Sequence, residues 1–459
     1  MRTGTSIPAI IVDSLRVGRA GPDAITRIQR QRLASLVRHA RTASPYYRSL
    51  YRGLPDNVDD APLLPPVGKR DLMAHFDDWV TDPAITLSAL KSDFLDDLQL
   101  VGYPYLGKYH VMTTSGTTGE PAIVIHDRDS WNVLHVLART RPHPLAGKGD
   151  GRQLLTRGIR VATLYATGGH YGGVVLAESV RHRSAILARR TRVLSVLQPV
   201  GELVRELNEF QPTMLGGYPS AMLLLAGEQR AGRLHIDPIR VICAGEVLTD
   251  AMREEIRTTF DCVVGEGYAA TEAPALSLQC EHQRFHVNAD WYALEPVDAD
   301  YRPVPLGETS DTALVTNLAN RVQPIIRYDL GDRVTMSSVL CPCGSRLPTV
   351  QVEGRTNDVL TFESRDHQSI SVLPLALASV IEETPGVHRF QAIGTGPTSL
   401  SLRLETEPGA AADAVWQDLD QRIEGFLTEL GVAGVSIEHS ADAPQPDPRS
   451  GKLRQVVRR

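Results

Sequence analysis

The sequence predicts an α/β fold, with a large N-terminal domain of mixed or parallel sheets and helices and a small α+β C-terminal domain. The chain has 459 residues, which is too long for one small module. Hydrophobic residues make up 42% of it, enough to bury a large core. Strand and helix patterns alternate between residues 212 and 264, and a separate pattern of strands and one helix follows residue 400.

The first predicted helix covers residues 24–50. Its apolar residues recur at three- and four-residue spacing, namely Ile25, Ile28, Leu33, Leu36 and Val37. Pro45 and the proline-rich run 63–66 punctuate this pattern.

The alternating segment predicts a largely parallel sheet covered by helices. The predicted strands are 213–215, 239–243 and 262–264, and the predicted helices are 221–230 and 250–260. Ser220 is the expected N-cap of the first helix, and Thr249 or Asp250 that of the second.

The last hundred residues predict a small domain with its own core. Leu400, Leu402 and Leu404 alternate with polar residues, as in a half-buried strand. One face of a helix is formed by Val415, Leu419, Ile423, Phe426 and Leu430. We place the boundary in a polar stretch, which gives an N-terminal domain of residues 1–353, a hinge of 354–358 and a C-terminal domain of 359–459.

Composition and charge exclude several classes of protein. The net charge of −6 argues against a general nucleic-acid binder. No apolar run approaches the roughly 20 residues that span a bilayer, and the run from Ile7 to Val12 is too short for a secretory signal. Five scattered cysteines do not form a disulfide scaffold. We therefore expect a cytoplasmic enzyme with no membrane or nucleic-acid partner.

The segment Thr113–Pro121 has the composition of a phosphate-binding loop. It holds two glycines and five hydroxyl side chains, which can approach and hydrogen-bond anionic oxygens. The flanks 109–112 and 122–125 both read as strands, so this is not the strand–loop–helix of a P-loop. A plain hairpin turn is the alternative interpretation.

Three further motifs follow in order along the chain. Gly265–Glu272 comes directly after a predicted core strand, where parallel sheets place ligand-binding residues. Ile325–Asp332 is an apolar run that ends in a glycine turn and an aspartate suited to ribose hydroxyls. Arg449–Arg454 places Lys452 beside a glycine. The alternative interpretation is a solvated turn for the first motif, an exposed turn with a surface ion pair for the second, and a solvated basic tail for the third.

In this order the four motifs resemble the ANL superfamily of adenylate-forming enzymes, and within it the phenylacetate–CoA ligase-like branch. Further segments that fit are Ser44–Arg48, Leu64–Pro66 with Lys69, Gly217–Ser220, Ala244–Glu246, Val315–Leu318 and Gly354–Asp358. The resemblance runs over almost the whole chain. It implies an AMP-forming acid ligase with a large adenylate-forming domain, which converts a carboxylic acid and ATP to acyl-AMP and pyrophosphate and then transfers the acyl group to CoA.

The resemblance also implies roles for single residues. Phosphates would be held by Thr114, Ser115, Gly116, Thr117, Thr118 and Gly119. The adenine would be framed by Gly245, Glu246, Gly267 and Tyr268, and the ribose bound by Asp332 with Arg355 nearby. The catalytic set would be Thr271 on the α-phosphate, Glu272 on Mg²⁺, and Lys452 between the carboxylate and the α-phosphate. A mobile C-terminal domain would bring Lys452 in and later move it out.

The acid-binding pocket implied by the resemblance contains Tyr165, Gly168, Gly169, His170 and Tyr218. Small glycine walls beside aromatic rings suit a flat aryl or arylacryl acid. A flexible glycine loop without a substrate role is the alternative.

Cys280, His286, Cys341 and Cys343 form a candidate zinc site. Three thiolates and one imidazole are a closed tetrahedral set of the kind that structural zinc prefers, and members of the phenylacetate branch carry a similar pattern. Unligated cysteines in a reduced cytoplasm are the alternative. A homodimer is left open.

The sequence departs from the family at three places, and these leave the acyl acceptor open. Glu120 stands where the family usually has lysine, and Asn357 stands at the hinge in place of aspartate or lysine. The stretch 361–368 contains no glycine, although thioester-forming relatives usually carry a glycine-containing loop there. An amine, a carrier-protein thiol or nitrite therefore compete with CoA as acceptor. A nucleotide-binding regulatory protein without catalysis is the remaining alternative.

Overall fold

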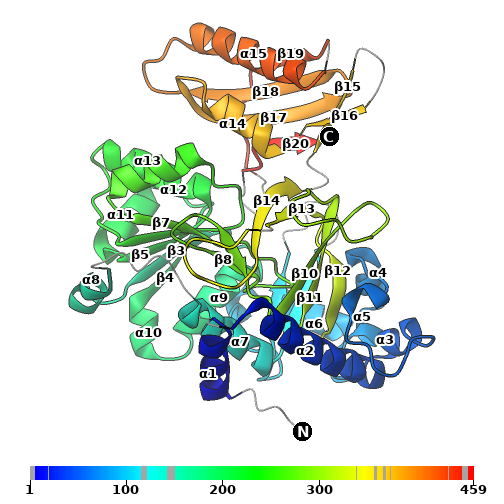
Figure 1. Ribbon diagram of the computed structural model, residues 1–459. Helices are drawn as coiled ribbons and strands as arrows, with labels where there is room; N and C mark the ends of the chain where they lie inside the picture. The colour runs from blue at the N-terminus through cyan, green and yellow to red at the C-terminus, as the bar shows by residue number, and fades with distance from the viewer. Residues whose placement is uncertain are drawn as a thin grey trace.

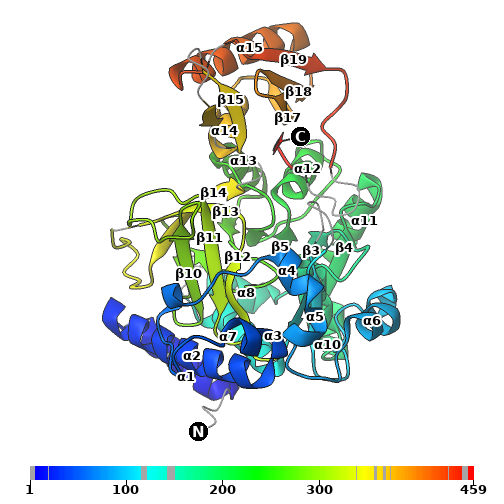
Figure 2. The ribbon, with the colours of Figure 1, turned by 90° about the vertical axis from the view of Figure 1, so that its right-hand side faces the viewer.

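A computed structural model describes residues 6–18, 20–114, 121–141, 150–337, 339–355, 359–364, 369–372, 374–432, 434–446 and 453–458. The segments after residue 359, coloured yellow to red, gather above the rest of the molecule in both views (Figures 1 and 2). Across the described residues, no helix combines the length and the apolar character that a membrane span requires.

A five-stranded parallel sheet lies at the centre of the larger part, as the alternating pattern predicted. Its strands are β3 (Val161–Tyr165), β4 (Thr191–Ser195), β5 (Met214–Gly217), β6 (Arg240–Cys243) and β7 (Val263–Glu266). They lie in the order β4-β3-β5-β6-β7, and all neighbours are parallel. The chain starts at β3, adds β4 on one side and then crosses to the other side. The sheet therefore has a topological switch point between β3 and β5.

The connecting helices confirm one detail of the sequence interpretation and correct another. They are α9 (Gly172–Arg181), α10 (Ala185–Arg190), α11 (Val200–Phe210), α12 (Pro219–Arg230) and α13 (Asp250–Phe260). Thr249 caps α13 as predicted. Ser220 does not cap α12, which begins at Pro219 with Tyr218 as its N-cap, because proline fits the first helical position.

The predicted helix 24–50 is two helices. Helix α2 (Pro22–Ala43) ends before Ser44, and α3 (Pro45–Leu50) begins directly after it. The Ser44 side chain accepts a hydrogen bond from the Tyr47 N–H and so caps α3. Serine before proline is thus a helix start here.

Antiparallel sheets and the N-terminal helices form a second large core beside the parallel sheet. The sheets are β1 (His110–Thr113) with β2 (Ile123–His126); β10 (Tyr292–Val297), β11 (Thr312–Asn317) and β12 (Ile325–Asp329); and β8 (Ser277–Gln279), β9 (Phe285–Val287), β13 (Asp332–Met336) and β14 (Thr349–Arg355). The remaining helices are α1 (Ile7–Val17), α4 (Lys69–Ala74), α5 (Phe76–Trp79), α6 (Leu87–Leu90), α7 (Arg128–Thr140) and α8 (Asp150–Arg157), with short turns at 61–63, 91–95 and 98–100.

The C-terminal residues bury a third core of their own, contributed by residues between Leu360 and Val456. Strands β15 (Leu360–Glu363) and β16 (Ser369–Val372) form a hairpin. The sheet β19-β18-β17-β20 contains β17 (Val387–Gly396), β18 (Ser399–Thr406), β19 (Ser436–Ser440) and β20 (Val456–Arg458), and the helices are α14 (Pro374–Glu382) and α15 (Ala412–Glu429). The predicted strand at 400–404 and helix at 415–430 are confirmed.

Arg327 is a buried anchor for the motif 325–332, whereas the sequence alternative was an exposed turn with a surface ion pair. Its guanidinium bonds Glu295 at 3.2 Å and the Leu64 carbonyl oxygen, and the residue is 3% exposed. Burial raises the pKa of Glu295 to about 6, and the adjacent Arg327 opposes that rise. The ion pair joins β12 to β10 and to the segment before α4.

We predict that Arg327→Leu lowers the free energy of unfolding by about 3–5 kcal/mol, because it leaves the buried Glu295 carboxylate without its cation. Denaturant unfolding measures the loss. Arg302→Leu is the matched control, since Arg302 pairs with Asp300 at the surface and should cost less than about 1 kcal/mol. Equal effects of the two variants would show that Arg327 is not an anchor.

Candidate active site

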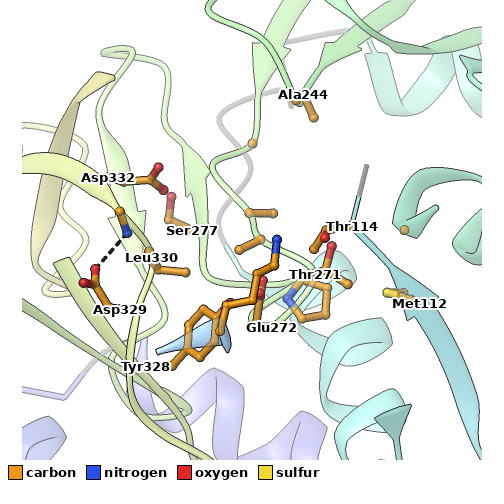
Figure 3. Close-up of a pocket in the computed structure, with 18 of the residues that line it drawn as sticks. Met112, Thr114, Ala244, Thr271, Glu272, Ser277, Tyr328, Asp329, Leu330 and Asp332 are labelled. Atoms are coloured by element: carbon orange, nitrogen blue, oxygen red, sulfur yellow. Dashed lines mark hydrogen bonds between the residues drawn. The ribbon is translucent and has the colours of Figure 1, made fainter. Parts of the chain in front are cut away.

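A cavity of about 720 Å³ opens at the carboxyl edge of the parallel sheet. Tyr165 ends β3, Tyr218 follows β5, Ala244 and Gly245 follow β6, and Gly267 follows β7; all line the cavity. The cavity therefore includes the switch point between β3 and β5, where sheets of this topology bind ligands. Residues from the antiparallel sheets close its other side (Figure 3).

The predicted phosphate loop begins at the cavity wall. Thr113 and Thr114 line it, at the end of β1. The Thr114 N–H donates to the Ala122 carbonyl at 2.9 Å, and the Thr114 hydroxyl accepts from the Ala122 N–H at 2.8 Å. These bonds join the two ends of the loop, as the strand–loop–strand prediction requires. Ser115, Gly116, Thr117, Thr118 and Gly119 lie outside the described residues.

Thr271 and Glu272 line the cavity, and their main chain is held by two buried side chains. The His126 Nε2 lies 3.0 Å from the Thr271 carbonyl oxygen, and the Asn317 Nδ2 donates to the Glu272 carbonyl oxygen at 2.9 Å. Burial lowers the pKa of His126, which keeps the ring neutral. Its Nε2 therefore carries the proton that the carbonyl accepts. The Glu272 side chain is 5% exposed.

Asp332 lines the opposite end of the cavity, after a rigid turn. Gly331 has a φ of 68°, and its N–H donates to Asp329 at 2.9 Å, the bond drawn in Figure 3. Asp329 also accepts from the hydroxyls of Tyr301 and Thr312. These three bonds fix the direction in which the chain leaves the turn.

Tyr268 and Arg355 lie next to Asp332. The Tyr268 hydroxyl donates to the Asp332 carboxylate at 2.9 Å, and Tyr268 is not among the lining residues. Its ring also lies edge to face against Phe285, with 6.3 Å between the ring centroids. Arg355 pairs with Asp332 across β13 and β14, so its backbone is near, as expected.

Two of the five residues predicted for the acid pocket line the cavity. Tyr165 and Tyr218 line the cavity with their rings edge to face, 5.2 Å between centroids. Burial raises the pKa of Tyr165 to about 12, so this wall is uncharged. Gly168, Gly169 and His170 are not among the lining residues. His170 instead accepts the Thr113 N–H on its carbonyl oxygen at 2.7 Å, and so supports the wall from behind.

The cavity includes residues beyond the five named above for the acid pocket. Met112, Tyr171, Gly172, Gly173 and Leu176 complete the wall beside Tyr165, and Lys69 enters from the N-terminal segment. Met112 directly precedes the predicted phosphate loop in the sequence, and this position could have identified it as a lining residue.

Lys69 reaches the cavity through a pairing between distant segments. The Val67 N–H donates to the Arg327 carbonyl at 3.0 Å, and the Asp329 N–H donates to the Val67 carbonyl at 3.0 Å. This bridge beside β12 carries the start of α4 to the cavity. A pairing across 260 positions has no local sequence signal.

Glu246 was expected at the adenine, but it is not among the lining residues. Its carboxylate accepts from the Ser220 N–H at 3.1 Å and the Ser220 hydroxyl at 3.0 Å. It also accepts from the Leu453 N–H at 2.7 Å. Lys452, the residue before Leu453, lies outside the described residues.

Cys280, His286, Cys341 and Cys343 converge as the metal prediction requires. Their ligand atoms all lie within 4.8 Å of one another. Cys280 Sγ and Cys341 Sγ are 3.4 Å apart, and Cys343 Sγ is 3.3 Å from His286 Nε2. The His286 Nδ1 bonds the Leu347 carbonyl at 3.2 Å, which leaves Nε2 facing the thiols. This donor set and its orientation fit tetrahedral zinc.

The other two cysteines do not join this cluster. Cys243 and Cys262 are buried at the parallel sheet, and burial raises the pKa of the Cys262 thiol to about 12. They are packing residues.

Comparisons with known proteins agree with this geometry. The family described as AMP-binding enzyme matches residues 109–303. Phenylacetate-coenzyme A ligase of Thermus thermophilus is 24% identical over 95% of this chain and 96% of that protein. Phenylacetate-coenzyme A ligase of Aromatoleum evansii is 25% identical over 80% of this chain and 78% of that protein.

Solved structures share the fold over nearly the whole chain. A 2-hydroxyisobutyryl-CoA ligase in its postadenylation state aligns with a TM-score of 0.70 at 19% identity, covering 97% of this chain and 91% of that chain. The same ligase in its thioesterification state aligns with a TM-score of 0.55 at 21% identity, covering 96% and 91%.

We predict opposite effects of alanine at two neighbouring glycines in the cavity wall. A Cβ at Gly173 would lie 2.7 Å from the Tyr165 ring, whereas one at Gly172 would meet only the Met112 sulfur at 3.5 Å. Gly173→Ala should therefore lower the free energy of unfolding by about 1–3 kcal/mol.

Gly172→Ala is the matched control, because it shares the gain in helix propensity without the clash. It should be neutral or stabilising. Chemical denaturation of both variants, also in a Tyr165→Ala background that removes the clash, measures the difference. A Gly173→Ala protein as stable as its Gly172→Ala counterpart would contradict the described wall.

Proposed function

Since the chain belongs to the ANL superfamily of adenylate-forming enzymes and to its phenylacetate–CoA ligase-like branch, we propose that it is an AMP-forming acid–CoA ligase. It activates a carboxylic acid with ATP as acyl-AMP and then transfers the acyl group to CoA. The observation that carries this proposal is the convergence of Thr114, Thr271, Glu272 and Asp332 on one cavity at the switch point.

The first half-reaction joins two anions. A carboxylate oxygen attacks the α-phosphorus of ATP, and the bond to pyrophosphate breaks. In the second half-reaction the CoA sulfur attacks the carbonyl carbon, and the bond to AMP breaks. The first step needs positive charge where negative charge accumulates. Lys452 supplies it in this proposal, and a Mg²⁺ ion held by Glu272 would neutralise phosphate charge.

The nucleotide occupies the side of the cavity between Thr114 and Asp332. Thr114 and the loop 115–119 take the phosphates, and Thr271 contacts the α-phosphate. Asp332, oriented by the Tyr268 hydroxyl, accepts from the ribose hydroxyls. Gly245 and Gly267 line the cavity near the expected adenine and let the backbone approach the base.

The acid occupies the opposite side, and an aryl acid fits it best. Three tyrosines, Tyr165, Tyr171 and Tyr218, line this wall together with Met112 and Leu176. Edge-to-face rings and a thioether are favourable surfaces for a flat aromatic ring. Arylacryl acids share that flat shape. The Aromatoleum relative acts on phenylacetate by its name, which supports this class.

CoA is the proposed acceptor, with a different small acceptor as the second candidate. Relatives that span most of the chain are CoA ligases. The stretch 361–368 lacks the glycine that usually lines the thiol tunnel, and Phe362 within it is fully buried in the C-terminal core. That observation favours testing an amine, a carrier-protein thiol and nitrite beside CoA. A screen of aryl acids by ATP–pyrophosphate exchange, followed by these acceptors, tests the proposal. The proposal would be refuted if none of the acids supported ATP–pyrophosphate exchange.

Structural zinc at the cluster of Cys280, His286, Cys341 and Cys343 is part of the proposal. The ion would connect β8 and β9 to the loop before β14 and would stabilise the wall behind Asp332. The mobility of residues 359–459, the cytoplasmic location and a homodimer also remain proposals.

We predict about one zinc ion per chain in protein never exposed to chelator, measured by elemental analysis. Cys341→Ser should lose the ion and lower the melting temperature, because it removes one of four ligands. Cys243→Ser, at a buried cysteine outside the cluster, is the control and should keep the ion. Metal-free wild-type protein would refute the site.

We predict that Lys452→Ala slows ATP–pyrophosphate exchange by at least about a hundredfold while ATP still binds, because the lysine acts in the transition state. Arg458→Ala is the matched control, since it removes an exposed cation of the same tail.

The second half-reaction separates the roles further. When it is started from synthetic acyl-AMP, Lys452→Ala should slow it far less, because the C-terminal domain would by then have moved the lysine away. Equal slowing of both half-reactions would show that Lys452 is not the adenylating lysine.

A further inference from the structure

One carboxylate joins the segment that carries Lys452 to the rest of the molecule. The Leu453 N–H donates to Glu246 at 2.7 Å, and Leu453 is 5% exposed. Lys452 directly precedes Leu453 in the sequence. Glu246 itself follows Ala244 and Gly245, which line the cavity. The contact thus lies one residue from the proposed catalytic lysine and one residue from the cavity wall.

The Glu246 carboxylate is held in place before it meets Leu453. The Ser220 N–H and hydroxyl both donate to it, at 3.1 Å and 3.0 Å. Ser220 lies in the first turn of α12, where backbone N–H groups have no partner within the helix. A carboxylate at this end of a helix is also favoured by the helix dipole. Glu246 is therefore an oriented acceptor, and the same carboxylate accepts from the Leu453 N–H of the C-terminal segment.

The other side of the contact is equally fixed. The Arg454 carbonyl accepts from the Gln391 amide at 3.1 Å, and the Gln455 carbonyl accepts from the Ala392 N–H at 2.7 Å. Val456 then pairs with Ala392 as β20 joins the edge of β17. Leu453 lies three residues before the first residue of this strand, so the C-terminal sheet presents its N–H as a fixed donor.

A second polar contact supports the same docked arrangement. Glu382 of α14 is hydrogen-bonded by Thr249, the N-cap of α13, and by the Gln455 amide at 2.6 Å. The loop 244–249 thus meets the C-terminal domain at Glu246 and at Thr249.

We propose that Glu246 is a positioning residue for the first half-reaction: it holds the Leu453 N–H and thereby places Lys452 at the cavity. This inference rests on the proposed function. It replaces the expected role of Glu246 at the adenine, because its carboxylate is committed to Ser220 and Leu453 and the residue does not line the cavity. When the C-terminal domain turns away for acyl transfer, this bond breaks.

The test compares Glu246→Ala with wild type in each half-reaction. Losing a hydrogen bond to a charged acceptor should lower the turnover of ATP–pyrophosphate exchange about tenfold to a hundredfold. ATP affinity by calorimetry should stay the same, and acyl transfer from synthetic acyl-AMP should change less than about twofold, because the bond is absent in that step. Glu254→Ala is the matched control, an exposed glutamate on α13, and should exchange like wild type.

A double-mutant cycle identifies the residue through which Glu246 acts. If it acts only by placing Lys452, Glu246→Ala should have little further effect in a Lys452→Ala background. If the double variant slowed exchange by the product of the two single fold-decreases, the proposal would be overturned. Weakened ATP binding by Glu246→Ala would also overturn it, because it would indicate a contact with the adenine. If the Glu246→Ala variant unfolds, Glu246→Gln replaces it in the same comparison. Glutamine keeps the side-chain shape and one acceptor oxygen, so a smaller decrease in exchange rate is expected. If none of the acids supported exchange by the wild-type protein, the proposed function itself would be refuted. If Glu246→Ala exchanged as fast as wild type, only this inference would be refuted.

Discussion

The parallel order of five strands is the constraint on which the rest of the structure depends. Because every strand points the same way, the loops that follow β3, β5, β6 and β7 meet at one edge of the sheet. The reversal of strand order between β3 and β5 opens a crevice there that side chains do not fill. Tyr165, Tyr218, Gly245 and Gly267 come from four separate segments, yet they line one cavity. The loop after β7, which carries Thr271 and Glu272, and the antiparallel sheet that contains Asp332 supply the polar groups that face them.

Those polar groups are held by buried hydrogen bonds and not by the ligand. His126 and Asn317 fix two successive carbonyl groups, so Thr271 and Glu272 keep their direction. Asp329 accepts three hydrogen bonds in the turn before Asp332. Groups fixed in this way need little reorganisation when charge develops on a reacting phosphate, which is the main source of electrostatic catalysis. The same reasoning applies to Glu246, which the Ser220 N–H and hydroxyl orient.

The sequence could predict features that depend on local pattern. The strands and helices of 212–264 follow from alternating periodicity, and the C-terminal helix follows from an apolar face of Val415, Leu419 and Ile423. The start of α12 was misplaced because Ser220 has the composition of a cap, whereas its side chain is used by Glu246, 26 positions away. The order of the motifs indicated which segments form the cavity. It could not distinguish a residue whose side chain lines the cavity from one such as His170, whose backbone carbonyl bonds the wall.

Features that depend on distant pairing had no sequence signal. Lys69 reaches the cavity because Val67 pairs beside β12, and Leu453 meets Glu246 across 207 positions. Each of these contacts joins segments whose local patterns are ordinary. They are set by how the sheets and the C-terminal domain pack, which a periodicity analysis of one chain does not contain.

The central claim is that a carboxylate oxygen becomes bonded to the α-phosphorus of ATP. It is tested most directly with an aryl acid labelled with ¹⁸O in its carboxyl group, in a complete reaction with ATP and CoA. When the thiol attacks the carbonyl carbon, the bridging oxygen leaves with AMP. The account predicts one ¹⁸O atom in each AMP formed, by mass spectrometry. Unlabelled AMP, or ¹⁸O in inorganic phosphate with ADP as the nucleotide product, would contradict it.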